Sequence, residues 1–169
     1  MPRVVEGSIT FDFPIGFVVQ KLDDTTFYKK HFQSFAQGAK AVDFLAFDPK
    51  ESELWLLEVK DYRAHGRIKT ITVYDEIAQK VFSSLACLLA MRANAVIQGE
   101  QNFAELATKQ IRLKVVLHLE QIAKPTKLRP QVVDPANCRI KLRQKVRSID
   151  SKAEFSSIAL SRNVPWKAQ

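Results

Sequence analysis

Residues 41–63, AVDFLAFDPKESELWLLEVKDYR, contain two apolar runs that are separated by a polar turn with one proline. Apolar runs of this length between turn residues are typical of strands, and the short connection predicts an antiparallel hairpin. We expect its strands over residues 40–47 and 53–62. Each run also carries an acid among apolar neighbours, Asp43 in the first and Glu58 in the second. Because an ionised carboxylate leaves water only for a partner or a function, these two acids are the first candidates for a site.

The register of this hairpin determines which residues share a face of the sheet. If Phe47 lies opposite Leu54, counting away from the turn places Asp43 opposite Glu58, with Cβ atoms about 5 Å apart. Lys60 points to the same face because side chains alternate along a strand. Two carboxylates this close repel each other unless a cation lies between them, and hard divalent ions take such oxygen ligands. The hairpin therefore predicts a metal site with an ammonium group beside it.

The rest of the chain alternates between strand patterns and helix patterns. Residues 75–93 lack Gly and Pro and predict the longest helix, with an apolar stripe formed by Ile77, Val81, Leu85, Leu88 and Leu89. We expect shorter helices over 23–38 and 101–109, two strands joined by a turn over 8–22, and a half-buried strand over 111–121. This alternation favours an α/β fold with a mixed central β-sheet flanked by helices. The length of 169 residues fits a single domain, residues 1–169.

The net charge of +8 is concentrated in the last third of the chain. Lys and Arg number 13 against 14 acids in residues 1–110, and 13 against 4 acids in residues 111–169. The segment CRIKLRQKVRSI alternates basic with other residues, and we expect a strand whose basic face is formed by Arg139, Lys141, Arg143, Lys145 and Arg147.

This basic face is a candidate nucleic-acid-binding surface. Alternate residues of a strand lie about 6.7 Å apart, a step comparable to the spacing of phosphates along a nucleic-acid strand. Arg63, Arg67 and Lys69 would extend the surface toward the two acids of the hairpin. Two alternatives remain: an edge strand that its charges protect from aggregation, and ordinary solubilising charge.

Asp43 and the triplet Glu58-Val59-Lys60 resemble the D…(D/E)-x-K signature of the PD-(D/E)XK nuclease superfamily, which includes restriction endonucleases. The similarity covers about half of the chain, as a layout of strand, strand, long helix and strand. It implies a restriction-endonuclease-like core over about residues 24–121, followed by a basic C-terminal extension over about 122–169. It also implies that Asp43, Glu58 and the carbonyl of Val59 bind Mg²⁺ or Mn²⁺, while Lys60 assists the attacking water. Gln79 matches a glutamine that some members carry on the following helix.

The chain also departs from this signature. Val42 stands where the signature has proline. The acid that members often carry on the first helix is unassigned, and Asp23 or Asp24 either fills that role or caps a helix. Triplets of an acid, any residue and Lys also begin at Asp48 and Asp150, so the apolar strand around residues 58–60, and not the triplet alone, carries the resemblance.

Together these features predict a Mg²⁺-dependent nuclease that hydrolyses phosphodiester bonds with metal-activated water, with DNA rather than RNA as the expected substrate. The alternatives are a non-catalytic nucleic-acid-binding module of the same fold, whose acids form a structural ion-pair network, and a protein-interaction domain with a basic face. A second copy or a protein partner could complete a substrate channel. The first residues lack the apolar core of a signal peptide and no long uncharged apolar segment occurs, so we expect a cytoplasmic protein without a membrane span.

Overall fold

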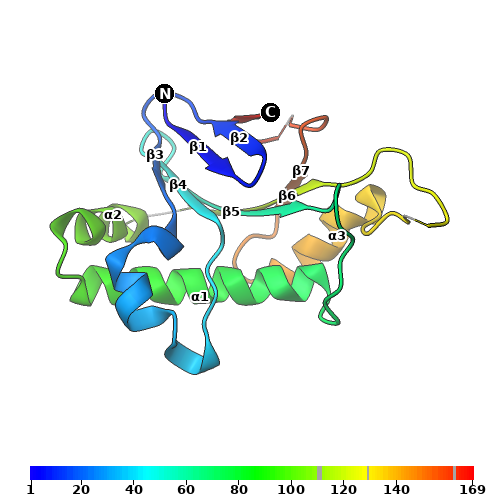
Figure 1. The fold of residues 1–169 in the computed structure, drawn as a ribbon. Helices are drawn as coiled ribbons and strands as arrows, with labels where there is room; N and C mark the ends of the chain where they lie inside the picture. Colours follow the sequence, from blue (N-terminus) through cyan, green and yellow to red (C-terminus); the bar gives the residue numbers. More distant parts are fainter. Residues whose placement is uncertain (110–111, 129, 162) are drawn as a thin grey trace.

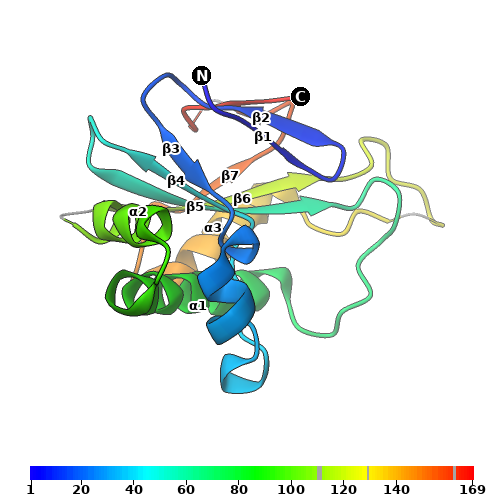
Figure 2. The same ribbon diagram turned by 60° about the vertical axis from the view of Figure 1, so that its left-hand side comes forward.

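The computed structural model describes residues 1–109, 112–128, 130–161 and 163–169, and this part of the chain forms three layers. A five-stranded sheet lies in the middle, with helices on one face and a three-stranded sheet on the other (Figure 1). The turned view in Figure 2 shows the same stacking, with α1, α2 and α3 below the central sheet. The predicted class, a mixed β-sheet flanked by helices, is confirmed.

The central sheet combines antiparallel and parallel pairs. β3 pairs with β4 and β4 with β5 in antiparallel fashion, whereas β5 pairs with β6 and β6 with β7 in parallel. In sheet order the strands are β3 (Val18–Gln20), β4 (Phe44–Asp48), β5 (Glu53–Asp61), β6 (Arg112–Glu120) and β7 (Glu154–Ser156). β6 is the strand expected over 111–121, and Ile111 at its predicted start lies outside the described residues.

The predicted hairpin and its register are confirmed. β4 and β5 pair with Phe44 opposite Leu57 and Phe47 opposite Leu54. Leu54 and Leu56 pack in the core on the helix side, while Trp55 and Leu57 pack between the two sheets. β5 is therefore apolar on both faces because both faces are covered, which explains its long apolar run.

The second sheet joins the two ends of the chain. It consists of β1 (Arg3–Glu6), β2 (Ile9–Asp12) and β8 (Lys167–Ala168), in the order β1-β2-β8. Thr10 and Gln169 exchange two backbone hydrogen bonds of 2.8 and 3.0 Å. The two strands expected over 8–22 exist as β2 and β3, but they belong to different sheets. β1 was not predicted.

The segment expected as one helix over 23–38 consists of three short helical pieces. These are η1 (Leu22–Asp24), η2 (Tyr28–Phe32), which is a π-helix, and η3 (Phe35–Gln37). Gly38 ends the segment with a φ of 98°, in the left-handed region that favours glycine.

Two regular helices follow the hairpin, α1 (Val73–Asn94) and α2 (Gln98–Thr108). The side chain of Thr72 caps α1 by accepting a hydrogen bond from the amide of Asp75. The predicted apolar stripe of α1 is correct for Ile77, Val81 and Leu88, which are fully buried. It is wrong for Leu89, which is 61% exposed, because the buried face turns toward Ser84 and Met91 instead.

The basic segment is a helix, so the predicted basic strand is wrong. α3 (Pro135–Val146) buries Cys138, Leu142 and Val146, which recur every four residues as a helix requires. Residues two positions apart point in nearly opposite directions on a helix, so the alternating basic residues are spread around α3 and form no single face. Ile140, which the strand would have buried with Leu142, is 55% exposed.

None of the helices in the described ranges is long and apolar enough to cross a membrane.

Candidate active site

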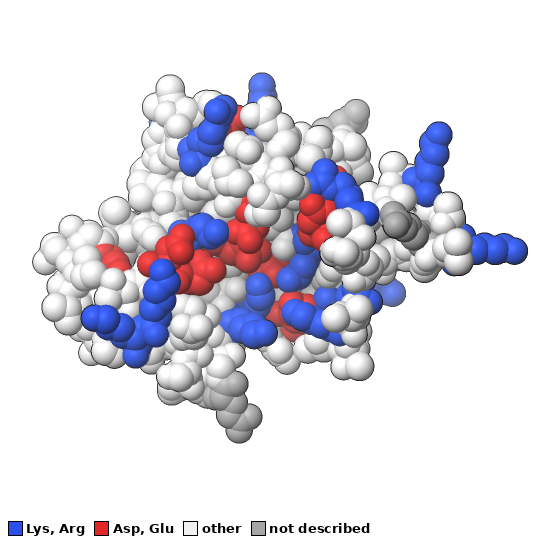
Figure 3. Space-filling view, in the orientation of Figure 1, with Lys and Arg blue, Asp and Glu red and all other residues white. Residues whose placement is uncertain are grey.

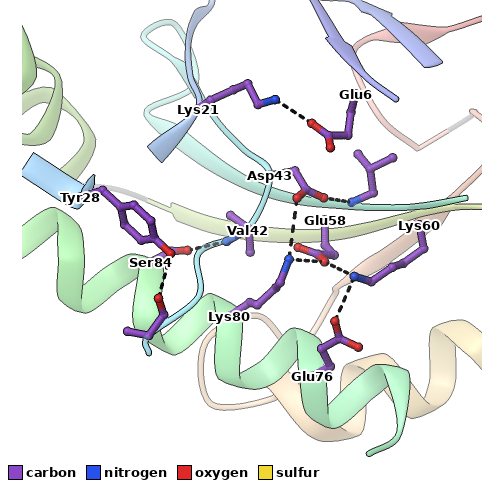
Figure 4. Close-up of polar contacts among 12 residues, drawn as sticks. Glu6, Lys21, Tyr28, Val42, Asp43, Glu58, Lys60, Glu76, Lys80 and Ser84 are labelled. Carbon is purple, nitrogen blue, oxygen red and sulfur yellow. Dashed lines mark hydrogen bonds and ion pairs between the residues drawn. The ribbon is translucent and has the colours of Figure 1, made fainter. Parts of the chain in front are cut away.

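Asp43 is the residue directly before β4, and the register of the hairpin extends to it. Two hydrogen bonds hold it there: the amide of Val42 donates to Oγ of Ser84 on α1 (2.9 Å), and the amide of Val59 donates to Oδ2 of Asp43 (2.6 Å). The confirmed register places Asp43 across from Glu58, and the contact with the neighbouring Val59 agrees with this placement (Figure 4). The carboxylate is thus fixed against β5, with 18% of its side chain exposed.

Glu58 is fully buried and is paired with two lysines. Nζ of Lys60 and Nζ of Lys80 each lie 2.6 Å from Oε1 of Glu58, whereas Oε2 of Glu58 has no hydrogen-bond partner in the part of the chain that the structure describes. Lys80 comes from α1 and also lies 3.7 Å from Oδ1 of Asp43, an ion-pair distance too long for a hydrogen bond. The two acids of the hairpin therefore share one ammonium group (Figure 4).

Glu76, four residues before Lys80 on α1, extends this cluster. It accepts hydrogen bonds from Lys60 (3.0 Å), Arg67 (2.8 Å) and Lys69 (2.6 Å). Burial alone would raise the pKa of Glu76, but these three cationic donors outweigh it and lower the pKa to about 2. Glu76 is therefore ionised at neutral pH and ties the loop after β5 to α1.

Burial and neighbouring charges shift the pKa values of Asp43 and Lys60. Burial, and then the charge of Glu58, raise the pKa of Asp43 to about 7, although Lys80 and the amide of Val59 act in the opposite direction. Burial would lower the pKa of Lys60, but the carboxylates of Glu58 and Glu76 outweigh it and raise that pKa above its ordinary value. Lys60 therefore remains a cation at neutral pH, while the carboxyl group of Asp43 gains or loses its proton near neutral pH.

The oxygen atoms of Asp43 and Glu58 fit a hard divalent ion in their chemistry. Among the described residues, Oε2 of Glu58 has no hydrogen-bond partner, and Oδ1 of Asp43 has only the 3.7 Å contact with Lys80. Such oxygens are the ligands that Mg²⁺ and Mn²⁺ prefer, and a cation between them would relieve the repulsion that raises the pKa of Asp43. The protein supplies only these two side chains: within the described ranges, no group of three or more His, Cys, Asp or Glu residues is arranged to hold a metal ion.

An open groove of about 430 Å³ borders the cluster. Its lining includes Lys40, Lys69, Glu76, Gln79 and Lys80. Gln79 is exposed at the groove, and it is its neighbour Lys80 that contacts the two acids. Figure 3 shows acidic and basic side chains mixed in a band across this face of the molecule.

The predicted nucleic-acid-binding residues are divided between several places. Arg67 and Lys69 belong to the cluster because both form ion pairs with Glu76. Arg63 instead pairs with Asp61 (2.6 Å) and donates to Ser8 of the small-sheet side (2.8 Å).

On α3 the basic residues mostly pair with acids of the same molecule. Arg139 and Arg143 pair with Glu154, and Lys145 lies 2.6 Å from Asp75. Arg147 is exposed. Lys141 is exposed as well; it lies 6.0 Å from the ring centre of Tyr74 and shares a pocket with Arg67 and Lys69.

Sequence reasoning missed Glu76 and Lys80. A signal for them exists: they lie four residues apart, next to Ile77 and Val81 in the buried stripe of α1, where charged residues need partners. The two candidates for a further acid, Asp23 and Asp24, are both exposed on η1.

Glu6 on β1 is the acid from the N-terminal region that acts on the site. Its charge contributes to the raised pKa of Asp43, and it pairs with Lys21 at 2.8 Å. The N-terminal strand, which was not predicted, thus brings an acid to the cluster.

Comparison with known proteins gives a partial match. The chain is similar to part of a cysteine-tRNA ligase from Neisseria meningitidis, with 31% identity over 208 residues that cover 98% of this chain and 29% of the ligase. The chain therefore spans less than a third of the length of that relative. No family model matches the chain, and no solved structure does.

Proposed function

We propose that this protein is a metal-dependent nuclease that hydrolyses a phosphodiester bond, with its active site at Asp43, Glu58 and Lys60. The observation that carries the proposal is the placement of two carboxylates across the hairpin, Asp43 just before β4 and Glu58 on β5. The pKa of Asp43 is raised to about 7, and Glu58 is fully buried with an oxygen that has no partner among the described residues. Buried acids with perturbed pKa values beside a groove are typical of functional sites. The resemblance to PD-(D/E)XK nucleases at these same residues supports the reaction class.

Each residue has a distinct part in this mechanism. Asp43, Glu58 and the backbone carbonyl of Val59 would hold the ion. A bound Mg²⁺ or Mn²⁺ supplies Lewis-acid chemistry, which lowers the pKa of a coordinated water and polarises a phosphoryl oxygen. Lys60 keeps its charge through Glu58 and Glu76, and its ammonium stabilises the negative charge that develops on the phosphoryl oxygens during attack.

The substrate would enter along the groove beside α1. Lys69, whose side chain is half exposed, and Lys141 on α3, which lines a neighbouring pocket together with Lys69, would contact phosphates next to the cleaved bond, and such contacts position a strand without reading its bases. DNA remains the expected substrate. RNA belongs in the test because the relative is named for a reaction on tRNA.

Cleavage assays test this proposal directly. Wild-type protein is incubated with single- and double-stranded DNA, a folded tRNA and single-stranded RNA, with Mg²⁺, with Mn²⁺ or with EDTA. We expect cleavage of at least one substrate with metal, none with EDTA, and a loss of at least 100-fold in Lys60→Met. Lys50→Met, the same substitution at an exposed lysine in the turn between β4 and β5, is the matched control. Absence of cleavage with every substrate and metal, or a Lys60→Met variant as active as wild type, would rule the nuclease out.

A second function, a non-catalytic nucleic-acid-binding module, is favoured by one observation. Lys60 and Lys80 already neutralise Glu58 within the protein, so the acids can serve as a structural ion-pair network. This function predicts binding of nucleic acid in EDTA without cleavage in any metal. Charge reversal by Lys141→Glu should then weaken binding at least tenfold, and unchanged binding would argue against this module.

A further inference from the structure

The two carboxylates of the candidate metal site already share a cation that belongs to the protein. Nζ of Lys80 lies 2.6 Å from Oε1 of Glu58 and 3.7 Å from Oδ1 of Asp43, with 13% of its side chain exposed. Figure 4 shows that it reaches both acids from α1, across from the hairpin. The lysine ammonium thus contacts the same two carboxylates that a divalent ion would use.

The carboxylates around this position are already neutralised without a metal ion. Asp43, Glu58 and Glu76 supply at most three negative charges, against four positive charges from Lys60, Arg67, Lys69 and Lys80, and the nearby pair of Glu6 and Lys21 adds one charge of each sign. A dication that enters this cluster would be repelled by the ammonium of Lys80, and the repulsion is strong because the site is partly buried. A metal ion binds carboxylate oxygens at about 2.1 Å, so an ion held by Oε2 of Glu58 and Oδ1 of Asp43 would compete with Lys80 for Oδ1 and repel its ammonium from Glu58.

We propose that Lys80 is an exchangeable counter-ion, which pairs with Asp43 and Glu58 in the free protein and moves to a substrate phosphate when the metal ion binds. The proposal rests on the metal site of the proposed nuclease. Lys80 also lines the open groove of about 430 Å³, so its flexible side chain has space to move and meets any anion bound there. The free protein therefore binds a divalent ion weakly, and the ion and a phosphodiester bind cooperatively.

Titration calorimetry with Mn²⁺ tests the first half of this proposal. Lys80→Met removes the charge but keeps an unbranched apolar side chain of similar length. We expect this variant to bind Mn²⁺ at least tenfold more tightly than wild type. Lys40→Met is the matched control because Lys40 lines the same groove and forms no ion pair among the described residues. The affinity of this variant for Mn²⁺ should stay within twofold of wild type. If thermal unfolding shows that Lys80→Met is poorly folded, Lys80→Gln replaces it.

A second titration tests the exchange with phosphate. Wild type is titrated with Mn²⁺ in the presence of a single-stranded DNA oligonucleotide whose phosphorothioate linkages resist cleavage. We expect at least tenfold tighter Mn²⁺ binding with the oligonucleotide, and a smaller gain in Lys80→Met, because the coupling between the two ligands acts through Lys80.

The outcomes separate this proposal from the nuclease function. Mn²⁺ binding by Lys80→Met that is no tighter than in wild type overturns the counter-ion role, even if wild type cleaves nucleic acid. An equal gain from the oligonucleotide in both proteins, or no gain in wild type, overturns the exchange with phosphate. Tighter Mn²⁺ binding by Lys80→Met with no cleavage by wild type supports the counter-ion and rejects the nuclease.

Discussion

Replacement of Asp43 by Asn tests the electrostatics of the site, because Asn removes the charge and keeps an oxygen that can accept the hydrogen bond of Val59. The pKa of Asp43 rises from 3.8 to about 7 on folding, chiefly through burial and the charge of Glu58. Between these two values the folded protein binds more protons than the unfolded chain, so the free energy of unfolding falls as pH rises. From pH 5 to pH 7 the fall is about 2–3 kcal/mol, at 1.36 kcal/mol for each pH unit.

This change is measured by urea unfolding, followed by circular dichroism, at pH 5, 6, 7 and 8 in EDTA. Relative to wild type, Asp43→Asn should gain about 2–3 kcal/mol between pH 5 and pH 8, because it lacks the charged group that the fold penalises at high pH. Asp24→Asn, a substitution of an exposed carboxylate, should follow the wild-type pH dependence. If the stabilities of wild type and Asp43→Asn run parallel across this range, the raised pKa of Asp43 is refuted.

Three further predictions concern the supports of the site and α3. Ser84→Ala leaves a buried amide without its acceptor and should cost about 1–3 kcal/mol in urea unfolding, whereas Ser83→Ala should cost less than about 0.5 kcal/mol. Glu76→Gln should lower the free energy of unfolding by about 3 kcal/mol at pH 7 and by less at pH 3. In wild type the lowered pKa of Glu76, about 2, adds stability above pH 4.5 that is lost as the pH falls. Equal losses at both pH values would contradict this. In the same assay Leu142→Ala should lower the free energy of unfolding by about 2–5 kcal/mol and Ile140→Ala by less than about 1 kcal/mol. If this segment were a strand, both side chains would be buried on one face and the two substitutions would cost similar amounts.

The hairpin was predictable because its two apolar runs lie on either side of a short polar turn, and its register was assumed. Placing Phe47 opposite Leu54 was enough to bring Asp43 to Glu58 and to put Lys60 on the same face. These relations are local in the sequence, so no knowledge of the tertiary structure was needed. The roles proposed for these residues remain predictions.

The error over α3 has a physical cause. Two periods compete in that segment: the basic residues recur every two positions, while Cys138, Leu142 and Val146 recur every four. Burial of the apolar residues decides the structure, because the basic side chains can reach solvent or an acid from any face of a helix. Asp134 followed by Pro135 is a helix-start signal that should have outweighed the alternation.

Lys80 was missed for a different reason. Its partners come from the hairpin, far from α1 in the sequence, and only tertiary packing brings them together. Sequence distance thus hid the contact that matters most for the charge of the site.

The small sheet has a consequence for how this fold can be carried by a longer polypeptide. Gln169 is hydrogen-bonded to Thr10, and the amide of Phe13 donates to the carbonyl of Pro2, so both ends of the chain lie along β2 in the same small sheet (Figure 1). A unit with adjacent ends can be inserted into a surface loop of a host protein without forcing that loop apart. For the same reason, a circular permutant with its ends joined and a new opening in the turn between β4 and β5 should keep both sheets, and with them the geometry around Asp43 and Glu58.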